Sequence, residues 1–215
     1  ERLKPLTFKT PKPLLKIDNT TILEKCINMI IEFGVQKIFL NTFHLSDQIF
    51  EFIKNKKFPI DIQIIKDGQN ILNTGGGILN MIKSTEDSNF IIFNPDTLWR
   101  KDYVTDIKKM QNFYFSNNLN NILLLIDKKK SFDKNLKGDF NLINNILKKN
   151  DDNNFIFTGC QILNKSLFEK YKIENFPISE VWNELLKKNE LNGFESSINF
   201  YHLTNLETFK KLQDH

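Results

Sequence analysis

The sequence contains little cysteine and little histidine. Its two cysteines, Cys26 and Cys160, both lie in apolar surroundings, so buried structural thiols are expected and no disulfide framework is indicated. The three histidines, His44, His202 and His215, have no partners at the spacing of a zinc site. Because this cysteine usage is compatible with a reducing compartment, we expect a cytoplasmic protein.

Long hydrophobic runs are also absent. The longest, such as residues 122–126, have the length of a strand and are far too short to cross a bilayer. No signal peptide is visible in the sequence. We therefore expect no membrane partner.

Charge and motif content exclude further classes of function. The formal net charge is only +4 and no basic block is denser than residues 128–130, so nucleic-acid binding is not indicated, although an anionic substrate would be attracted. The sequence has no GxxxxGK(S/T) phosphate loop, no GxSxG elbow and no GxGxxG turn. A P-loop NTPase, an α/β-hydrolase and a Rossmann dehydrogenase are therefore disfavoured.

Hydrophobic periodicity runs through the whole sequence and switches between helical and strand spacing. Thr21 and Glu24 form a capping-box pattern ahead of the first helix, and Gly34 ends it. Helices are expected at residues 22–33, 45–56, 78–82, 102–115, 179–188 and 206–212. Strands are expected at residues 37–41, 60–65, 90–93, 122–126, 139–143, 155–163 and 198–203.

Short strands separated by helices predict βαβ units. We therefore expect an α/β fold: a Rossmann-like, mainly parallel open sheet flanked by helices, in a single domain over residues 1–215. Residues 139–143 and 155–163 are expected to form a small antiparallel portion beside it. The polar residues 148–154 are expected to form an exposed turn.

Open sheets of this kind bind ligands beyond the carboxyl ends of their strands, and three segments are candidates. The first is the N-terminal segment, which has three prolines within residues 5–13 and so cannot form a helix or a central strand. As a fixed loop it would present Arg2, Lys4, Lys9 and Lys12 to a phosphate. The alternative is a solvated basic tail, which composition alone favours.

The second segment is residues 73–77, Asn-Thr-Gly-Gly-Gly, between an apolar strand and a helix. Glycines let a backbone approach a ligand closely, and the following helix N-terminus offers unpaired N–H groups. A flexible turn is the alternative.

The third segment is residues 94–99, directly after the apolar strand 90–93. Asp96 would point into the crevice at the end of the sheet and is a natural Mg²⁺ ligand, because Mg²⁺ prefers carboxylates and substrate phosphates. The alternative is a solvated aspartate in a turn after proline.

Taken together, these segments resemble the sugar-1-phosphate nucleotidyltransferase family, and most closely its N-acetylmuramate-1-phosphate uridylyltransferase branch. Nearly the whole chain takes part in the resemblance. The matching residues are Arg2, Pro5, Leu6 and Thr7, residues 10–14 (TPKPL), residues 74–78 (TGGGI), Asn94, Asp96 and Trp99, residues 138–140 (GDF), and residues 157–159.

This resemblance implies transfer of a nucleoside monophosphate from an NTP, UTP in this branch, to a sugar 1-phosphate such as N-acetylmuramate 1-phosphate. Lys12 would neutralise the triphosphate, Arg2 would help to hold it, and Asp96 would bind Mg²⁺. The backbone of Thr74, Gly75, Gly76 and Gly77 would contact the base. The small antiparallel portion, with Gly138, Asp139, Thr158 and Gly159, would line the sugar side.

The sequence departs from the family pattern in two places. The glycine-rich loop of the family, and the strand before it, should lie upstream of Arg2. His202 stands where the family usually has a second metal-binding aspartate, so it is a second candidate metal ligand. Two alternatives stay open: another substrate pair, such as GTP with mannose 1-phosphate, and a non-catalytic nucleotide-sugar-binding domain. The sequence does not predict the oligomeric state.

Overall fold

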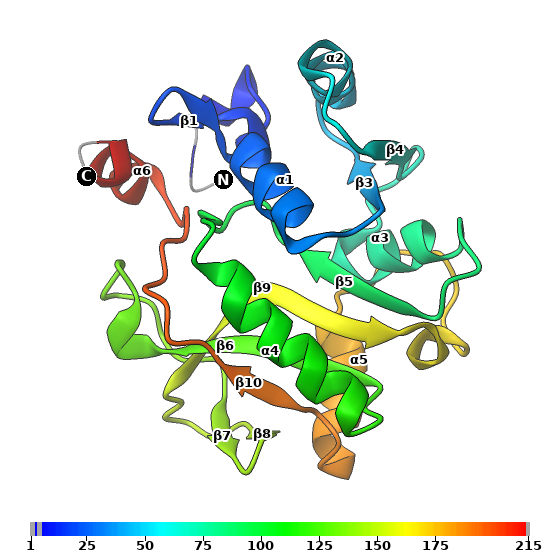
Figure 1. Ribbon diagram of the computed structural model, residues 1–215, viewed down its shortest axis with the longest axis vertical. Coiled ribbons are helices and arrows are strands. Elements are labelled where there is room, and N and C mark those ends of the chain that lie inside the picture. The colour runs from blue at the N-terminus through cyan, green and yellow to red at the C-terminus, as the bar shows by residue number, and fades with distance from the viewer. Residues whose placement is uncertain (1–2, 4–5, 214–215) are drawn as a thin grey trace.

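The computed structural model describes residue 3 and residues 6–213, and its centre is a four-stranded sheet (Figure 1). The strand order is β10-β6-β9-β5, from Gly193–Glu195, Asn121–Asp127, Phe155–Asn164 and Asn89–Phe93. Only β9 runs against its neighbours, since it pairs antiparallel with β5 and β6 while β10 pairs parallel with β6. The expected α/β fold with a mostly parallel sheet is confirmed.

Helices cover both faces of this sheet. On one face α1 (Ile22–Phe33) and α4 (Tyr103–Ser116) pack over alternate residues of β6, and on the other α3 (Asn73–Ile82) and α5 (Ser179–Lys188) do so. Residues 122–126 of β6 are therefore fully buried, which explains their unbroken apolar run. Both cysteines are buried too, as expected, and burial raises the pKa of each thiol.

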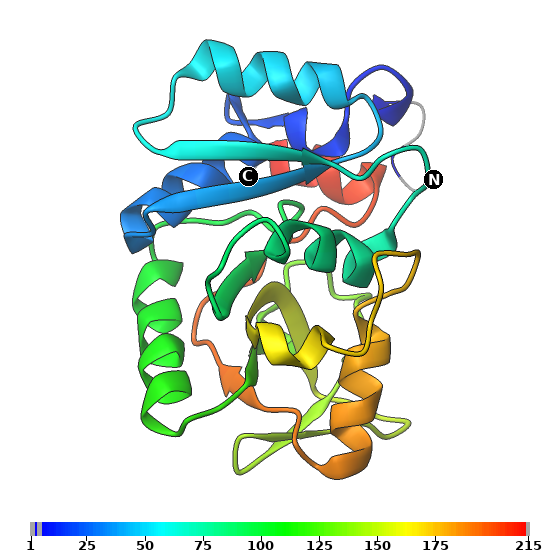
Figure 2. The same cartoon turned by 90° about the vertical axis from the view of Figure 1, so that its right-hand side faces the viewer.

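A second pair of strands lies above this sheet in Figure 2. In it β3 (Lys37–Thr42) pairs parallel with β4 (Asp61–Lys66), and α2 (Ser46–Lys56) connects them. A cavity of about 860 Å³ lies between β3 and β5 and is lined by residues of both strands. Within the described part of the chain, β3 and β5 are not hydrogen-bonded to each other. The two sheets thus flank a gap that is also lined by residues of α1 and α3.

The remaining elements are short. Two hairpins turn at residues with positive φ, at Asp18 and Asn19 and at Asn144 and Asn145, as two-residue hairpin loops require. Their strands are β1 (Lys16–Ile17) with β2 (Thr20–Thr21) and β7 (Asn141–Ile143) with β8 (Ile146–Lys148). The 3₁₀ turns are Leu6–Phe8, Lys12–Leu14, Lys128–Lys130 and Lys165–Phe168, and the last helix is α6 (Leu206–Gln213). No helix in the described ranges combines the length and apolarity that crossing a membrane needs.

The expected cap of α1 forms only in part. The Thr21 hydroxyl accepts from the Glu24 N–H at 3.1 Å, and Gly34 ends the helix at φ 102°. The Glu24 carboxylate pairs with Lys56 of α2 at 2.7 Å. The capping pattern in the sequence therefore predicted the start of the helix correctly, while its acidic residue ties two helices together.

The structure differs from the sequence prediction in two segments, the expected strand at residues 198–203 and the expected exposed turn at residues 148–154. Residues 198–203 form no regular strand, because Phe200 bridges to Ser131 and His202 bridges to Thr97, so the segment changes partner within two residues. The strand that joins the sheet is β10, which is three residues long. The turn at residues 148–154 is polar as expected, but Asn153 within it is buried.

Candidate functional site

Lys12, Asp96 and His202 line one cavity of about 760 Å³. They come from three separated parts of the chain: the 3₁₀ turn Lys12–Leu14, the turn after β5, and the segment before α6. His44, which follows β3, lines the same cavity. Its position beyond the carboxyl ends of β3 and β5 is where an open sheet binds ligands.

The prolines around Lys12 fix its backbone. Pro11 has φ −61° and ψ 141°, and its carbonyl accepts from the Leu14 N–H at 2.8 Å. The Lys12 ammonium donates to Asp96 Oδ2 at 2.8 Å, and both side chains are about one-third exposed (30% and 28%). Lys12 is thus part of a fixed loop and not of a solvated tail. Arg2 and Lys4 lie outside the described residues.

The turn that carries Asp96 is pinned at both ends. The Asn94 N–H donates to the Gly159 carbonyl at 2.8 Å, and the buried Trp99 indole donates to the Asn94 carbonyl at 2.8 Å. The Leu203 N–H donates to the Asp96 carbonyl at 2.9 Å, which brings the C-terminal segment to the site. The asparagine and tryptophan of this motif therefore hold the aspartate in place.

Asp96 is held ionised. Burial alone would raise its pKa, but a protonated His202 and the Lys12 ammonium, which also donates a hydrogen bond, outweigh that effect and lower the pKa below its usual range; with His202 neutral, Lys12 supplies the positive charge. Its Oδ1 atom is buried and has no hydrogen-bond partner among the described residues. A buried carboxylate oxygen without a partner is costly, and a bound cation would satisfy it.

His202 is the third member of the cluster. Its ring stacks on Phe200, with centroids 5.6 Å apart and planes at 13°. Nε2 lies 3.8 Å from Asp96 Oδ2, and Nδ1 lies 3.3 Å from the Thr97 hydroxyl. Burial lowers the pKa of His202, although Asp96 opposes this. The neutral ring is therefore favoured, and it presents a lone pair that a metal can use.

The predicted sugar-side residues Gly138, Asp139, Thr158 and Gly159 do not line this cavity, and their contacts in the structure are with neighbouring protein groups. Gly159 has φ 91°, and a Cβ there would lie 2.9 Å from Asn94 Cβ. Thr158 is buried and donates to the Leu124 carbonyl at 2.8 Å. Asp139 accepts from the Phe157 N–H at 2.9 Å, and burial raises its pKa.

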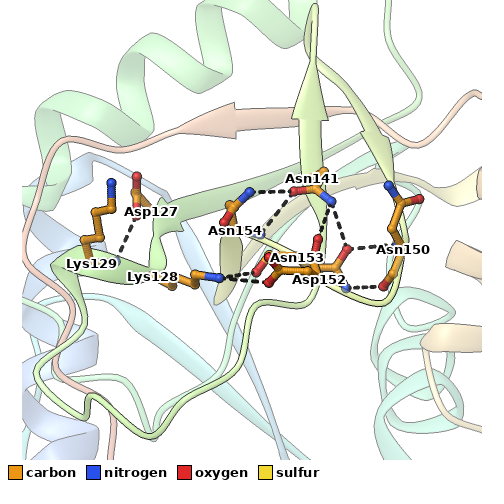
Figure 3. Close-up of polar contacts among 8 residues, drawn as sticks. All are labelled: Asp127, Lys128, Lys129, Asn141, Asn150, Asp152, Asn153 and Asn154. Atoms are coloured by element: carbon orange, nitrogen blue, oxygen red, sulfur yellow. Dashed lines mark hydrogen bonds and ion pairs between the residues drawn. The ribbon is translucent and has the colours of Figure 1, made fainter.

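Gly138 packs on a loop held by asparagines. A Cβ at Gly138 would lie 2.1 Å from the Asn153 carbonyl oxygen. Figure 3 shows how that loop is fixed: Asn141 donates to the Asp152 carbonyl and to Asn153, and Lys128 donates to Asp152 and to the Asn153 carbonyl. Asn153 also exchanges two hydrogen bonds with Asn150. This network orders the side of the molecule that carries Gly138 and Asp139.

The expected bare glycine turn is wrong as a local structure. The helix α3 begins at Asn73, so Thr74, Gly75, Gly76 and Gly77 form its first turn. The N–H groups of Gly75 and Gly76 both donate to the Phe176 carbonyl, and the Thr74 hydroxyl accepts from the Ile178 N–H. A Cβ at Gly76 would lie 2.0 Å from the Glu174 carbonyl oxygen. Because these glycines have no side chains, residues 174–178 can pack closely against the start of α3. None of the three glycines lines the cavity of Lys12 and Asp96.

Sequence reasoning missed two contributors to the site. His44 follows an apolar strand just as Asp96 does, so the same positional argument would have found it. Thr97 is fully buried, links His202 to the Thr158 carbonyl, and gave no signal of its own in the sequence. No group of three metal-binding side chains occurs among residues 3 and 6–213. An ion held by Asp96 and His202 would therefore need phosphates and water as its remaining ligands.

Comparison with known proteins shows which family contains this arrangement of residues. The profile of the family described as "Nucleotidyl transferase" matches residues 1–130. The chain is 26% identical over 219 residues to the D-glycero-alpha-D-manno-heptose 1-phosphate guanylyltransferase of Aneurinibacillus thermoaerophilus, covering 99% of this chain and 92% of that protein. It is 28% identical over 127 residues to the mannose-1-phosphate guanylyltransferase of Mycobacterium tuberculosis, covering 58% of this chain but only 34% of that protein.

A solved structure shares the fold over nearly the whole length of both chains. The crystal structure of HddC from Yersinia pseudotuberculosis complexed with GMP-PN matches with a TM-score of 0.79 and 22% identity, covering 99% of this chain and 93% of that one. The profile match spans more than half of the chain and includes both Lys12 and Asp96. The chain therefore belongs to the nucleotidyl transferase family of enzymes.

Proposed function

We propose that this enzyme transfers a nucleoside monophosphate from an NTP to a sugar 1-phosphate and releases pyrophosphate, in the cavity of Lys12, Asp96 and His202. The observation that carries the proposal is the 2.8 Å contact between the Lys12 ammonium and Asp96 Oδ2. A cation and a carboxylate that can bind a metal ion, side by side in one cavity, are what a triphosphate needs.

Each residue has a role in the proposed reaction. Lys12, with Arg2, would neutralise the phosphates of the NTP, and Asp96 would hold a divalent cation, with Mg²⁺ as the first candidate. Such an ion would offset charge on the reacting phosphate. The sugar phosphate oxygen would attack the α-phosphorus in line, with no covalent enzyme intermediate. Catalysis would consist of positioning and charge neutralisation.

The choice of base and sugar is the finer part of the proposal. The two relatives of known activity named above are guanylyltransferases, and the similar structure of HddC was solved as a complex with GMP-PN. UTP and N-acetylmuramate 1-phosphate are supported by the sequence motifs alone. We retain this pair as the candidate, with GTP and mannose 1-phosphate as the alternative. Gly138, Asp139, Thr158 and Gly159 would shape the sugar side. The base contact that the motifs assign to residues 74–77 would need groups other than the amides of Gly75 and Gly76, which already donate to the Phe176 carbonyl.

The gap between β3 and β5 supports a further strand of this domain. Neighbouring strands lie about 4.8 Å apart, and the 860 Å³ cavity is bounded by strand edges on both sides. The Thr42 hydroxyl at the end of β3 is buried and has no hydrogen-bond partner within residues 3 and 6–213. We propose that a strand from upstream of residue 1 fills this gap and leads into the glycine-rich loop of the family. A chain extended by that strand should show protected amides along β3 and β5 in hydrogen exchange.

Pyrophosphate release over a panel of NTPs and sugar 1-phosphates tests the function, using protein that carries the upstream residues. We expect one pair to be turned over, and Asp96→Asn to lower turnover by about 100-fold or more, the scale of losing one electrostatic contact to the transition state. The matched control is Asp102→Asn, whose carboxylate is exposed and whose nearest cation, Arg100, is 3.9 Å away. Unchanged turnover in Asp96→Asn would refute the metal assignment. Nucleotide binding without turnover in the unsubstituted protein would favour a non-catalytic domain.

A further inference from the structure

The surroundings of Asp96 Oδ2 point to a specific role for His202. Oδ2 accepts from the Lys12 ammonium at 2.8 Å and lies 3.8 Å from His202 Nε2. What His202 can bind at this position depends on which of its two ring nitrogens carries the proton in the neutral ring.

Thr97 determines that choice. Its hydroxyl oxygen lies 2.6 Å from the Thr158 carbonyl oxygen, and a carbonyl can only accept, so the Thr97 proton lies on this contact. The Thr97 oxygen is then left as an acceptor toward His202 Nδ1 at 3.3 Å. Thr97 is fully buried, so water does not compete. The neutral His202 ring therefore carries its proton on Nδ1 and keeps its lone pair on Nε2, the nitrogen that lies 3.8 Å from Asp96 Oδ2.

We propose that His202 Nε2 is the second protein ligand of the divalent cation, and that it biases this site toward a first-row transition ion such as Mn²⁺ or Co²⁺ over Mg²⁺. This inference rests on the function proposed above. It goes beyond that function because it concerns which ion the site selects. Thr97 would be a positioning residue, since it acts only through the imidazole.

The distances allow one ion to reach both atoms. Metal bonds to nitrogen and oxygen are about 2.0–2.2 Å long, so two ligands of one ion lie at most about 4.4 Å apart. The 3.8 Å between Nε2 and Oδ2 is within that limit. The Lys12 ammonium donates to Oδ2, and the phosphates of a bound nucleotide would draw it away.

The chemistry of the two ligands sets the preference. Mg²⁺ strongly favours oxygen ligands and keeps its waters, whereas imidazole binds first-row transition ions well. A site with one carboxylate and one imidazole should therefore discriminate against Mg²⁺ more than a site with two carboxylates. His202→Asp creates the two-carboxylate site in the same cavity and offers a direct comparison.

Metal binding tests this without relying on turnover. Mn²⁺ is titrated into the protein with a non-hydrolysable NTP analogue and followed by electron paramagnetic resonance, with Mg²⁺ as competitor. We expect pulsed spectra to show nitrogen coupling from an imidazole, and His202→Asn to lose it. In His202→Asp, the preference for Mn²⁺ over Mg²⁺ should fall by about tenfold or more. Thr97→Val should weaken Mn²⁺ binding by about tenfold although it removes no ligand, as loss of a group that orients a ligand does.

His44 supplies the matched control, because it is a histidine that lines the same cavity. His44→Asn should keep the nitrogen coupling and the Mn²⁺ preference, and melting curves confirm that each variant folds. Nitrogen coupling that survives in His202→Asn, or equal ion preference in His202→Asp and the unsubstituted protein, would overturn the inference while leaving pyrophosphate release intact. Absence of both metal binding and nucleotide binding in the unsubstituted protein would overturn this inference and the proposed function together.

Discussion

Lys12 and Asp96, 84 residues apart in the chain, form a 2.8 Å ion pair inside the candidate cavity. The ammonium lies on Oδ2, while Oδ1 is buried and accepts no hydrogen bond from the residues that the structure describes. The positive charge of Lys12 therefore repels a divalent cation that approaches this carboxylate. Because the phosphates of an NTP attract the same ammonium, nucleotide binding and metal binding should reinforce each other.

Replacing Lys12 by methionine tests that coupling. Lys12→Met should weaken binding of the NTP analogue by about tenfold or more, the effect of losing one well-placed charge contact to phosphate. The same change should tighten Mn²⁺ binding to the nucleotide-free protein, because it removes a like charge from Oδ2. Calorimetric titrations measure both. Lys101→Met, which removes an exposed lysine paired with Glu32, should change neither. Weaker Mn²⁺ binding in Lys12→Met would contradict the competition.

Gly76→Ala tests whether the glycine triplet is needed for packing. Alanine usually stabilises a helix relative to glycine by about 0.5–1 kcal/mol. Here a Cβ would lie 2.0 Å from the Glu174 carbonyl oxygen, so the backbone of residues 174–176 must move. We expect a loss of about 1–3 kcal/mol, as for overpacked sites, measured as a lower urea midpoint. Lys83→Ala at the exposed end of α3 should stay within about 0.5 kcal/mol. A stabilised Gly76→Ala protein would refute the packing argument.

The sequence predicted the elements whose pattern is local. The start of α1 at Thr21, its end at Gly34 and the buried run of β6 all follow from neighbouring residues and were found correctly. The apolar residues of 198–203 were misleading. Phe200 and Leu203 are buried because the segment passes between two different neighbours, and a one-dimensional pattern cannot distinguish this from a strand.

The candidate site was only partly predictable for a related reason. The family motifs identified Lys12 and Asp96, and the structure brings them together. The same motifs identified Thr74 to Gly77, but not that Phe176, about 100 residues later, would take up the amides of Gly75 and Gly76. The orientation of His202 depends on a buried hydroxyl and a distant carbonyl. Sequence spacing carries no information about such contacts.

The two tryptophans offer a matched test of the turn that carries Asp96. Each indole donates one hydrogen bond: Trp99 to the Asn94 carbonyl at 2.8 Å, and Trp182 to the Gln161 side chain at 3.0 Å. Phenylalanine at either position should cost about 1–3 kcal/mol of stability, because a buried acceptor loses its partner. Only Trp99→Phe should also weaken Mn²⁺ binding, since it alone loosens the turn of Asp96. Equal effects on Mn²⁺ binding would show that Trp99 acts through global stability.

Asp106 provides the clearest pH dependence of stability. This buried carboxylate in α4 accepts from the Ser196 hydroxyl at 2.8 Å and from the Ser197 N–H at 2.9 Å, and it holds the segment that leads to His202. Burial alone would raise its pKa, but these hydrogen bonds outweigh burial and lower it. Because the folded pKa lies below the unfolded value of about 3.9, the stabilisation is fully present above that value. It is lost as the pH falls through the folded pKa.

Asp106→Asn should therefore cost about 1–3 kcal/mol at neutral pH. The difference from the unsubstituted protein should shrink below about pH 4, where the unfolded carboxylate begins to bind its proton. Urea unfolding at a series of pH values measures the difference, and Asp102→Asn on the same helix end should show little of it, because its carboxylate is exposed. A difference that stays constant down to pH 2 would mean that Asp106 contributes through shape and not through its charge. In that case the hydrogen bonds from Ser196 and Ser197 would be no stronger than those to a neutral amide.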